Sequence, residues 1–209
     1  MALRDHSLDQ RITDAARAEF LEKGYQGASL RKIAERAGVT VGAIQVRYAS
    51  KDALFASLLQ PFLEAVETAF REVKADYYGP EEGGLQAHLQ RSMRRESDTI
   101  LHVIFDHYEE AFLLFHRSEG STLARYFDQV VEEKIRESVR FFQSAGVPQA
   151  DERLLGMLIS LQFESYRRIV ADCPDRESAQ HYMNALMTYH FGGWTALFQE
   201  KAQEGEHEV

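Results

Sequence analysis

The side chains with the clearest binding chemistry lie between residues 40 and 51. Gln45 can donate and accept a hydrogen bond at once, which suits the N6 and N7 edge of adenine. Arg47 could place its forked guanidinium on guanine or, more readily near a helix end, on a phosphate. Lys51 follows Ser50, which can cap a helix whose first N–H groups already attract an anion. These types suit contact with a nucleic acid. An exposed glutamine and an ordinary surface lysine are the alternatives.

Side chains that could bind a metal or catalyse a reaction do not form a distinctive group. His102, Asp106 and Glu109 or Glu110 would share one helix face, as metal ligands can, but polar residues at this spacing usually mark a solvated face. The chain contains no Gly-rich phosphate loop, nucleophile elbow or His-Glu-x-x-His pattern. We therefore predict that the protein is not an enzyme and uses no metal or cofactor.

Composition and cysteine content are typical of a folded protein of the cytoplasm. The 209 residues are 44% hydrophobic and 27% charged, enough for one large domain or for a small module joined to a larger one. Cys173 is the single cysteine, which excludes an internal disulfide and a multi-cysteine zinc site. The chain starts without an apolar signal core, and no apolar run approaches the roughly 20 residues that span a bilayer. We expect a cytoplasmic location and no membrane partner.

Charge is distributed unevenly along the chain. The net charge of −9 alone argues against a nucleic-acid partner, because phosphate binding depends on Lys and Arg. Residues 1–60, however, contain nine Lys/Arg and seven Asp/Glu, a net of +2, and the remainder contains 15 and 26, a net of −11. A mildly basic N-terminal module could therefore face DNA while the acidic remainder stays away from the phosphates.

Helical periodicity dominates the sequence, and no stretch alternates as a half-buried strand would. We expect an all-α fold, with an N-terminal three-helix bundle over residues 1–50 joined to a larger helical regulatory and dimerisation domain over residues 51–209. Pro61 predicts a kink or break near Leu59 and Gln60. The expected helices are 8–22, two short helices capped by Ser29 and Thr40, and then 51–77, 85–95, 98–117, 122–144, 154–171 and 178–201.

The two short helices meet at a glycine turn. Gly38 ends the first helix because it accepts a left-handed conformation without steric cost, and Thr40 begins the second. Gly42 and Ala43 would form a small outward face that can approach base edges closely. Val46 is expected to pack against the first helix, with contact to a thymine methyl as the alternative. This pattern indicates a helix-turn-helix, whose second helix enters the DNA major groove, although any compact three-helix bundle could show the spacing.

Several motifs in order make this region more specific. The run GYQGASLRKIAERAGVTVGAIQVRYASKDALFASLL, residues 24–59, resembles the TetR family of bacterial repressors in its Gly-Tyr pair, capped second helix, IAxxAGV segment and SKxxL segment. The resemblance implies base or phosphate contacts from the second helix, the recognition helix and a lysine that follows it. The corresponding DNA-binding residues are Arg31, Thr40, Val41, Gly42, Ala43, Gln45, Arg47 and Lys51. Gln45 departs from the family's usual tyrosine, which removes the phosphate contact of that tyrosine.

The remaining helices contain two aromatic-rich stripes, which are first of all core; a ligand cavity between them is the functional alternative. Polar residues that interrupt an apolar face point more strongly to a ligand, although a neighbouring helix can satisfy each of them. The candidate effector pocket comprises Phe105, Tyr108, Phe112, His116, Phe127, Gln162 and Tyr166.

The last two expected helices keep an apolar side over several turns. Gly192 and Gly193 lie beside Trp194, and a glycine inside a helix costs about 1 kcal/mol relative to alanine, a loss that close approach of another backbone can offset. The resemblance implies that these helices pair with their counterparts in a second subunit as a four-helix bundle. The candidate dimer residues are Leu154, Met157, Leu161, Met183, Leu186, Met187, His190 and Trp194.

Together these features predict a homodimeric, ligand-responsive transcriptional regulator, in particular a repressor, that binds double-stranded operator DNA and is released by a small apolar or amphipathic effector. In this hypothesis the fourth helix, interrupted at Pro61, transmits the change to the DNA-binding region. The alternative is an all-helical small-molecule carrier or metal-sensing protein without specific DNA binding, which the weak positive charge of the N-terminal module would favour.

Overall fold

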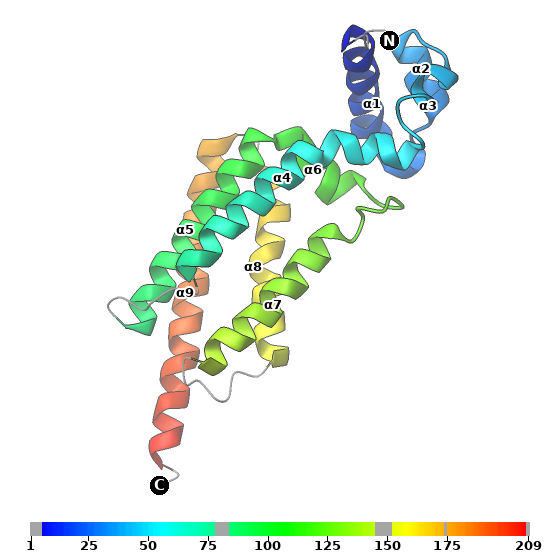
Figure 1. Cartoon of the computed structure of the whole chain (residues 1–209). Coiled ribbons are helices and arrows are strands. Elements are labelled where there is room, and N and C mark those ends of the chain that lie inside the picture. The colour runs from blue at the N-terminus through cyan, green and yellow to red at the C-terminus, as the bar shows by residue number, and fades with distance from the viewer. Residues whose placement is uncertain (1–5, 78–83, 145–151, 174, 208–209) are drawn as a thin grey trace. The chain divides into compact units, whose positions relative to one another are not determined.

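The computed structural model describes residues 6–77, 84–144, 152–173 and 175–207. In these ranges the regular structure is helical and contains no strand, so the predicted all-α fold is confirmed. None of the described helices is both long enough and apolar enough to cross a membrane. The helices are α1 (His6–Gly27), α2 (Leu30–Ala37), α3 (Val41–Gln45), α4 (Lys51–Tyr77), α5 (Leu85–Asp106), α6 (Tyr108–Arg117), α7 (Tyr126–Ser144), α8 (Glu152–Asp172) and α9 (Arg176–His207) (Figure 1).

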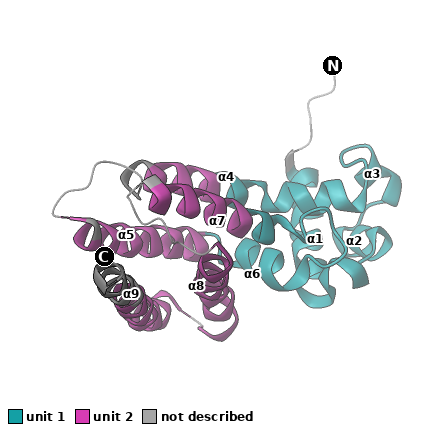
Figure 2. Ribbon diagram, turned by 90° about the horizontal axis from the view of Figure 1, so that it is seen from below, with its two compact units in different colours: residues 1–64, 107–129 teal, residues 65–106, 130–209 magenta. Residues whose placement is uncertain are grey.

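The chain divides into two compact units (Figure 2). Unit 1 comprises residues 1–64 and 107–129, and unit 2 comprises residues 65–106 and 130–209. The division falls within α4, between α5 and α6, and within the first turn of α7, so α6 belongs with the N-terminal helices. These units differ from the predicted domains, whose boundary after residue 50 stays a prediction about which segments bind DNA and which bind an effector or a second subunit.

Unit 1 has an aromatic and aliphatic core. Phe20 and Phe55 are fully buried, and their rings meet edge-on with centroids 4.9 Å apart. Tyr25 adds a third ring, 5.2 Å from that of Phe55. Ile33 of α2 and Ile44 of α3 are also fully buried. Burial of a side chain of this size contributes about 1.5–3 kcal/mol, so packing rather than intrinsic propensity holds these short helices in place.

Polar contacts fasten α6 and the segment that follows it within unit 1. Arg17 of α1 forms an ion pair with Glu110, and its Nη1 lies 3.3 Å from a carboxylate oxygen of Glu109. Asp52, near the start of α4, accepts hydrogen bonds from the backbone N–H and the hydroxyl of Thr122 at 2.9 and 2.7 Å. Residues 107–129 therefore pack with the helices that carry the N-terminal motif.

The structure agrees with the predicted bounds of α4 and corrects a helix boundary further along the chain. α4 continues through Pro61 as one helix, because neighbouring apolar side chains such as Phe62 are buried and offset the lost backbone hydrogen bond. α5 also runs past Glu96 and Ser97, where the sequence predicts a gap between two helices. Glu96 and Ser97 lie inside α5, and each is only 1% exposed, so these polar residues belong to a buried helix face and not to a surface loop. The break comes instead at His107, whose φ of −128° and ψ of 44° are not helical.

Unit 2 combines α5, α8, α9 and α7 from residue 130 onwards with the second part of α4 (Figure 2). α9 packs against α5 and α8. Phe163 of α8 is buried, and its ring stacks on that of Phe70 of α4 with centroids 6.3 Å apart. Trp194 of α9 stacks on Phe142 of α7 at 6.0 Å. These aromatic contacts join different helices of this unit.

Candidate nucleic-acid interface

Hydrogen-bonded caps define α2 and α3 as the two helices of a helix-turn-helix. The hydroxyl of Ser29 accepts a hydrogen bond from the N–H of Lys32 at 3.2 Å. The hydroxyl of Thr40 accepts one from the N–H of Ala43 at 3.1 Å. Each cap satisfies an N–H group that has no partner within its own helix. Gly38 ends α2 at φ 64° and ψ 41°, the left-handed conformation predicted for this glycine.

Arg11 of α1 fixes the turn between the two helices. Its Nη2 donates hydrogen bonds to the carbonyl oxygen of Ala37 at 2.6 Å and to that of Gly38 at 3.3 Å. A Cβ built on Gly38 would lie only 2.9 Å from this nitrogen. Any other residue at Gly38 would therefore meet both an unfavourable backbone conformation and this guanidinium.

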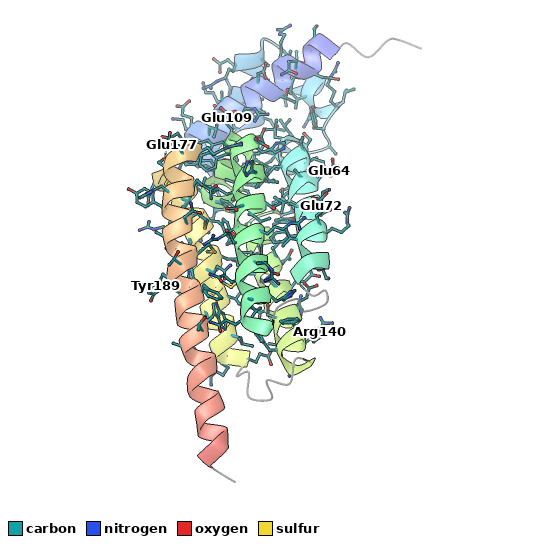
Figure 3. The ribbon with its side chains drawn as sticks, turned by 90° about the vertical axis from the view of Figure 1, so that its left-hand side faces the viewer. Glu64, Glu72, Glu109, Arg140, Glu177 and Tyr189 are labelled. Atoms are coloured by element: carbon teal, nitrogen blue, oxygen red, sulfur yellow. The ribbon has the colours of Figure 1, made fainter. Side chains whose placement is uncertain are left out.

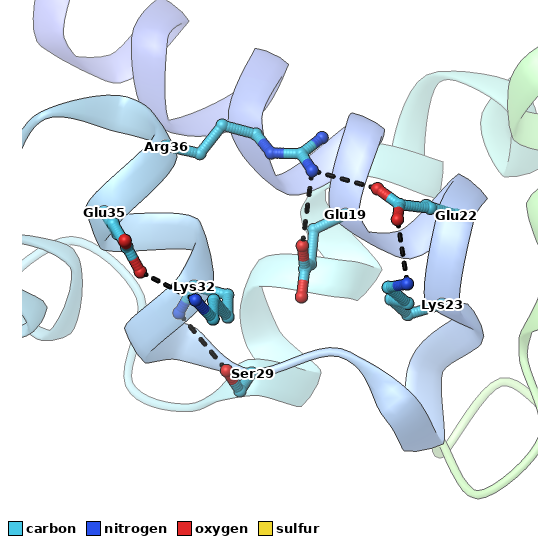
Figure 4. A network of polar contacts seen from close by, with 7 residues as sticks. All are labelled: Glu19, Glu22, Lys23, Ser29, Lys32, Glu35 and Arg36. Carbon is cyan, nitrogen blue, oxygen red and sulfur yellow. Dashed lines mark hydrogen bonds and ion pairs between the residues drawn. The ribbon is translucent and has the colours of Figure 1, made fainter.

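Ion pairs hold α1 and α2 together at the surface (Figure 4). Arg36 Nη2 lies 3.0 Å from a carboxylate oxygen of Glu22 and 3.7 Å from one of Glu19. Lys32 pairs with Glu35 along α2 at 3.0 Å. Exposed pairs of this kind stabilise a fold by up to about 1 kcal/mol each. They also leave less positive charge on α2 for a phosphate than the sequence suggests.

The outward face of α3 is small and uncharged. Ile44 is fully buried, whereas Gly42 and Gln45 are exposed. Val46, which the sequence predicts to pack against the first helix, is 85% exposed, so that prediction is wrong. Ile44 already fills the inward position, and residues two apart do not share a helix face. The exposed segment therefore ends with an amide and a branched apolar side chain next to each other.

Arg47 is held inside unit 1 by a residue far away in the sequence. Its Nε forms an ion pair with Asp9 of α1, and its Nη1 donates to the carbonyl oxygen of Ala43 at 3.3 Å. The two charged side chains are 17% and 19% exposed. The guanidinium thus connects the end of α3 to α1, and its contact with DNA stays a prediction.

Lys51 also makes contacts within unit 1. Its Nζ donates to the carbonyl oxygens of Tyr25 at 2.7 Å and Ala28 at 3.0 Å, and it lies 4.3 Å from the centre of the Tyr25 ring. These bonds satisfy carbonyl groups at the end of α1 and tie the start of α4 to it. An ammonium group has three donors, so one is left for a phosphate.

The eight residues predicted to contact DNA all lie in unit 1, on or beside α2, α3 and the start of α4. Arg31, Thr40, Gly42 and Gln45 are exposed, and the other four are half-buried. None of the ion pairs found among the described residues involves Arg31. Sequence reasoning missed the supporting role of Arg11, whose partners lie 26 and 27 positions away and leave no local signal.

Comparison with known proteins agrees with this geometry. The family model for bacterial regulatory proteins of the tetR family matches residues 12–58, which contain α2, α3 and both caps. The chain belongs to the TetR family. A curated relative, the HTH-type transcriptional regulator PksA of Bacillus subtilis, is 31% identical over 81 residues. That match covers 39% of this chain and 40% of PksA, so the chain spans well under half the length of this relative.

Solved structures extend the likeness of this TetR-family chain to its whole fold. A TetR-like transcriptional regulator from Rhodococcus sp. RHA1 has a TM-score of 0.62 and 18% identity, with 92% of this chain and 100% of that chain covered. The transcriptional regulator FadR from Bacillus subtilis, solved in complex with stearoyl-CoA, has a TM-score of 0.58 and 15% identity, with 88% and 98% covered. At these identities the comparison shows the fold alone.

The predicted effector-pocket residues of this TetR-family chain fall into both compact units. The division coincides with the break at His107, which separates the predicted helix over 98–117 into α5 and α6. Gln162 and Tyr166 are buried one turn apart on α8, at 6% and 1% exposure. Unit 1 holds Tyr108, Phe112, His116 and Phe127, and unit 2 holds Phe105, Gln162 and Tyr166.

The acidic face considered as a metal site does not form one face. α5 ends at Asp106, which pairs with Arg176. The helix is interrupted there, and Glu109 and Glu110 lie in α6, where they contact Arg17. The carboxylates are therefore matched with arginines rather than with one another. Across the described ranges, no group of three or more His, Cys, Asp or Glu side chains is placed to hold a metal ion.

The residues predicted to form a dimer interface lie in different environments. Met183, Met187 and Trp194 are buried within unit 2 itself, at 0%, 6% and 9% exposure. Met157 and Leu161 of α8, by contrast, are 60% and 61% exposed. Leu154, Leu186 and His190 are half-buried. Only the exposed members offer substantial apolar area to a second subunit.

Two further exposed side chains, tyrosines of α9 that sequence reasoning missed, lie on a helix that packs against α8. Tyr182 and Tyr189 of α9 are 56% and 77% exposed, and Tyr189 points away from the other helices of unit 2 (Figure 3). No described atom outside the local helix backbone and chain neighbours lies within 4 Å of a Cβ built on Gly192 or Gly193. We call Met157, Leu161, Tyr182 and Tyr189 the exposed α8/α9 face. α9 is apolar on more than one side, so periodicity could not show which side faces the core.

Proposed function

We propose that this TetR-family protein is a transcriptional repressor that binds double-stranded operator DNA as a homodimer and is released by a small apolar or amphipathic effector bound in unit 2. The observation that carries the proposal is α3, a capped helix with a small, exposed and uncharged outward face. Such a helix can approach base edges closely in a major groove, where each base pair presents a distinct pattern of donors, acceptors and methyl groups.

Base reading is assigned to two consecutive side chains at the end of α3. Gln45 is exposed and can pair with the N6 and N7 edge of adenine, whereas the neighbouring Val46 can contact a thymine methyl. Arg31, exposed at the start of α2, supplies a cation to a base or phosphate beside them. Lys51 adds one N–H donor to the backbone contact, and Arg47 positions α3 through Asp9 rather than holding DNA on its own.

Dimerisation is assigned to the exposed α8/α9 face. Its four large side chains expose apolar area that a second subunit can bury. Gly192 and Gly193, which have no described side chain close by, let a second backbone approach. A two-fold dimer can place two recognition helices about 34–36 Å apart, which matches successive major grooves on one face of DNA.

Effector control is supported by the fold and by a relative. FadR from Bacillus subtilis was solved in complex with stearoyl-CoA, so a protein of similar fold binds a small molecule with a long apolar chain. α4 contributes residues to both compact units, which suits a helix that transmits a change between them. Pro61→Ala should therefore alter effector sensitivity more than DNA affinity without effector. The opposite result would remove α4 from the switch.

The deciding experiment titrates the full-length protein against the DNA upstream of its own gene at several salt concentrations. A specific complex that loosens as salt rises supports the regulator. Gln45→Ala should lose discrimination between that DNA and a scrambled duplex while it keeps nonspecific affinity. If both affinities fall together, Gln45 contacts phosphate. If the wild-type protein forms no specific complex across that region, a small-molecule carrier or metal-sensing protein without specific DNA binding is the better assignment.

A further inference from the structure

The interior of unit 2 contains a buried ion pair between α5 and α7. Lys134 donates to Glu96 Oε2 at 2.7 Å, and the two side chains are 12% and 1% exposed. Removing charges from water is so unfavourable that well-packed apolar residues are often at least as stabilising as a buried pair. Stability alone is therefore a poor reason for this ion pair to be buried, and a role in ligand binding is a better one.

Two buried polar atoms in the same unit have no hydrogen-bond partner in the described part of the chain. These atoms are Glu96 Oε1 and Tyr166 Oη. Both residues are only 1% exposed, so water at the surface does not satisfy them. Nearly all buried polar atoms in folded proteins are paired, because an unpaired one loses its bonds to water and gains none. Glu96 Oε1 can therefore accept a further hydrogen bond, and the Tyr166 hydroxyl can donate one.

The negative charge of Glu96 also acts on the Tyr166 phenol. Burial, followed by the negative charges of Glu96 and Asp98, raises the pKa of the Tyr166 phenol well above its usual value. The phenol therefore keeps its proton and can donate it in a hydrogen bond. Tyr166 does not donate it to Glu96, since each of the two atoms is without a partner. Each atom is therefore left able to bond to a group from outside the described part of the chain.

Further buried polar side chains continue along α5 and α7. Residues 88, 92 and 96 of α5 are four apart and so share one face, as do residues 134 and 138 of α7. The rings of His88 and Phe141 lie 6.3 Å apart, while Lys134 contacts Glu96, so the two faces pack antiparallel. The buried polar members of these faces are His88, Ser92, Glu96 and Ser138.

We infer that Glu96, Lys134 and Tyr166 form the polar end of the effector site, and that the effector is a neutral, mainly apolar molecule with a hydroxyl group. The inference rests on the effector response proposed above. A ligand hydroxyl can donate to an acceptor such as Glu96 Oε1 and can accept from a donor such as Tyr166 Oη. A carboxylate or phosphate would face the charge of Glu96. An ammonium would add a second cation beside Lys134.

Three probes with the same apolar chain test the ligand class: 1-decanol, decanoate and decylamine. The 209-residue chain has one tryptophan, and Trp194 stacks on Phe142 within unit 2, so its fluorescence reports on this unit. We expect 1-decanol to bind at least tenfold more tightly than either charged probe. Tighter or equal binding of a charged probe, or no binding by any of the three, would overturn the assignment.

Variants then locate the binding groups. Tyr166→Phe should weaken 1-decanol binding at least tenfold with an unfolding midpoint no lower than that of the wild type, because the lost hydroxyl has no partner in the protein. Ser165→Ala is the matched control, since this neighbouring hydroxyl already donates to the carbonyl oxygen of Leu161 at 3.2 Å, and it should keep full affinity. Unchanged affinity or a lower midpoint in Tyr166→Phe would show that the hydroxyl serves only the fold and would refute the site.

Glu96→Gln gives an independent check on charge. It keeps an acceptor and the size of the side chain but removes the repulsion of an anion, so the preference for 1-decanol over decanoate should shrink at least tenfold. A preference that persists would refute the role of Glu96. DNA titration of the same samples separates the two proposals. If the wild type shows no specific DNA complex, the proposed repressor fails, whereas the fluorescence titrations still decide which molecules unit 2 binds.

Discussion

Replacing Gly42 with alanine should raise the stability of the protein and lower its affinity for DNA. Gly42 is exposed in α3, its φ is not in the left-handed region, and the nearest atom to a Cβ built there is Thr40 Oγ1 at 3.8 Å. Alanine therefore fits the free protein without strain. It should add about 0.5–1 kcal/mol by restricting the unfolded chain. For a chain of 209 residues this corresponds to a rise of roughly 1–4 °C in the thermal midpoint.

The expected loss of DNA affinity has a separate cause. The new methyl group lies on the outward face of α3, where the proposed complex requires close approach to base edges. We expect the affinity for the specific site to fall at least tenfold, which corresponds to about 1.4 kcal/mol. Fluorescence anisotropy with the upstream duplex and a scrambled duplex, at one fixed salt concentration, measures this change, and circular dichroism gives the midpoint.

Gly38→Ala is the matched control for this pair of effects. Gly38 has φ 64°, and a Cβ there would lie 2.9 Å from Arg11 Nη2, so alanine should cost about 1–2 kcal/mol or more and lower the midpoint. Unchanged DNA affinity in Gly42→Ala would contradict the close approach of α3 to DNA. A lowered midpoint in Gly42→Ala would contradict the open surroundings of Gly42.

Five further substitutions test other parts of the protein. Arg31→Ala should reduce the slope of log affinity for DNA against log salt concentration by about one, while it changes the free energy of unfolding by less than about 0.5 kcal/mol. Arg47→Met should lower the free energy of unfolding, measured in urea, by about 1.5–3 kcal/mol because a partly buried ion pair is lost. Leu161→Arg and Tyr189→Arg should each shift the dimer towards monomer in analytical ultracentrifugation, and a dimer that resists both changes would exclude the exposed α8/α9 face. Burial lowers the pKa of His190 in the folded protein, so as pH falls the unfolded state takes up a proton before the folded state does. The free energy of unfolding should therefore fall as pH drops below about 6.5, and it should fall less in His190→Phe.

Local rules were sufficient to predict the helix-turn-helix. Ser29 and Thr40 cap the two helices as expected, and Gly38 has the left-handed conformation that its position between them requires. Each of these features depends on residues within four positions of one another, so the sequence contains all the information that they need. The exposure of Gln45 follows from the same short periodicity.

Contacts between distant residues could not be predicted in this way. Arg47 and Lys51 have the residue types of phosphate ligands, but their partners Asp9, Tyr25 and Ala28 lie 23 to 38 positions away. A basic side chain near a helix end looks the same in sequence whether it meets a phosphate or a carbonyl oxygen. Only the fold shows that both side chains also attach α3 and α4 to α1.

The misplaced helix boundary near residue 96 and the proposed effector site have the same physical origin. Apolar periodicity identifies a helix by its buried face, so a buried face that contains Ser92 and Glu96 loses the signal and resembles a gap. A protein that binds a partly polar ligand needs polar atoms at such positions, and it leaves some without internal partners, as with Glu96 Oε1 and Tyr166 Oη. Local and global signals are expected to disagree at functional sites. The disagreement within α5 is therefore itself a reason to test Glu96 first among the buried residues of unit 2.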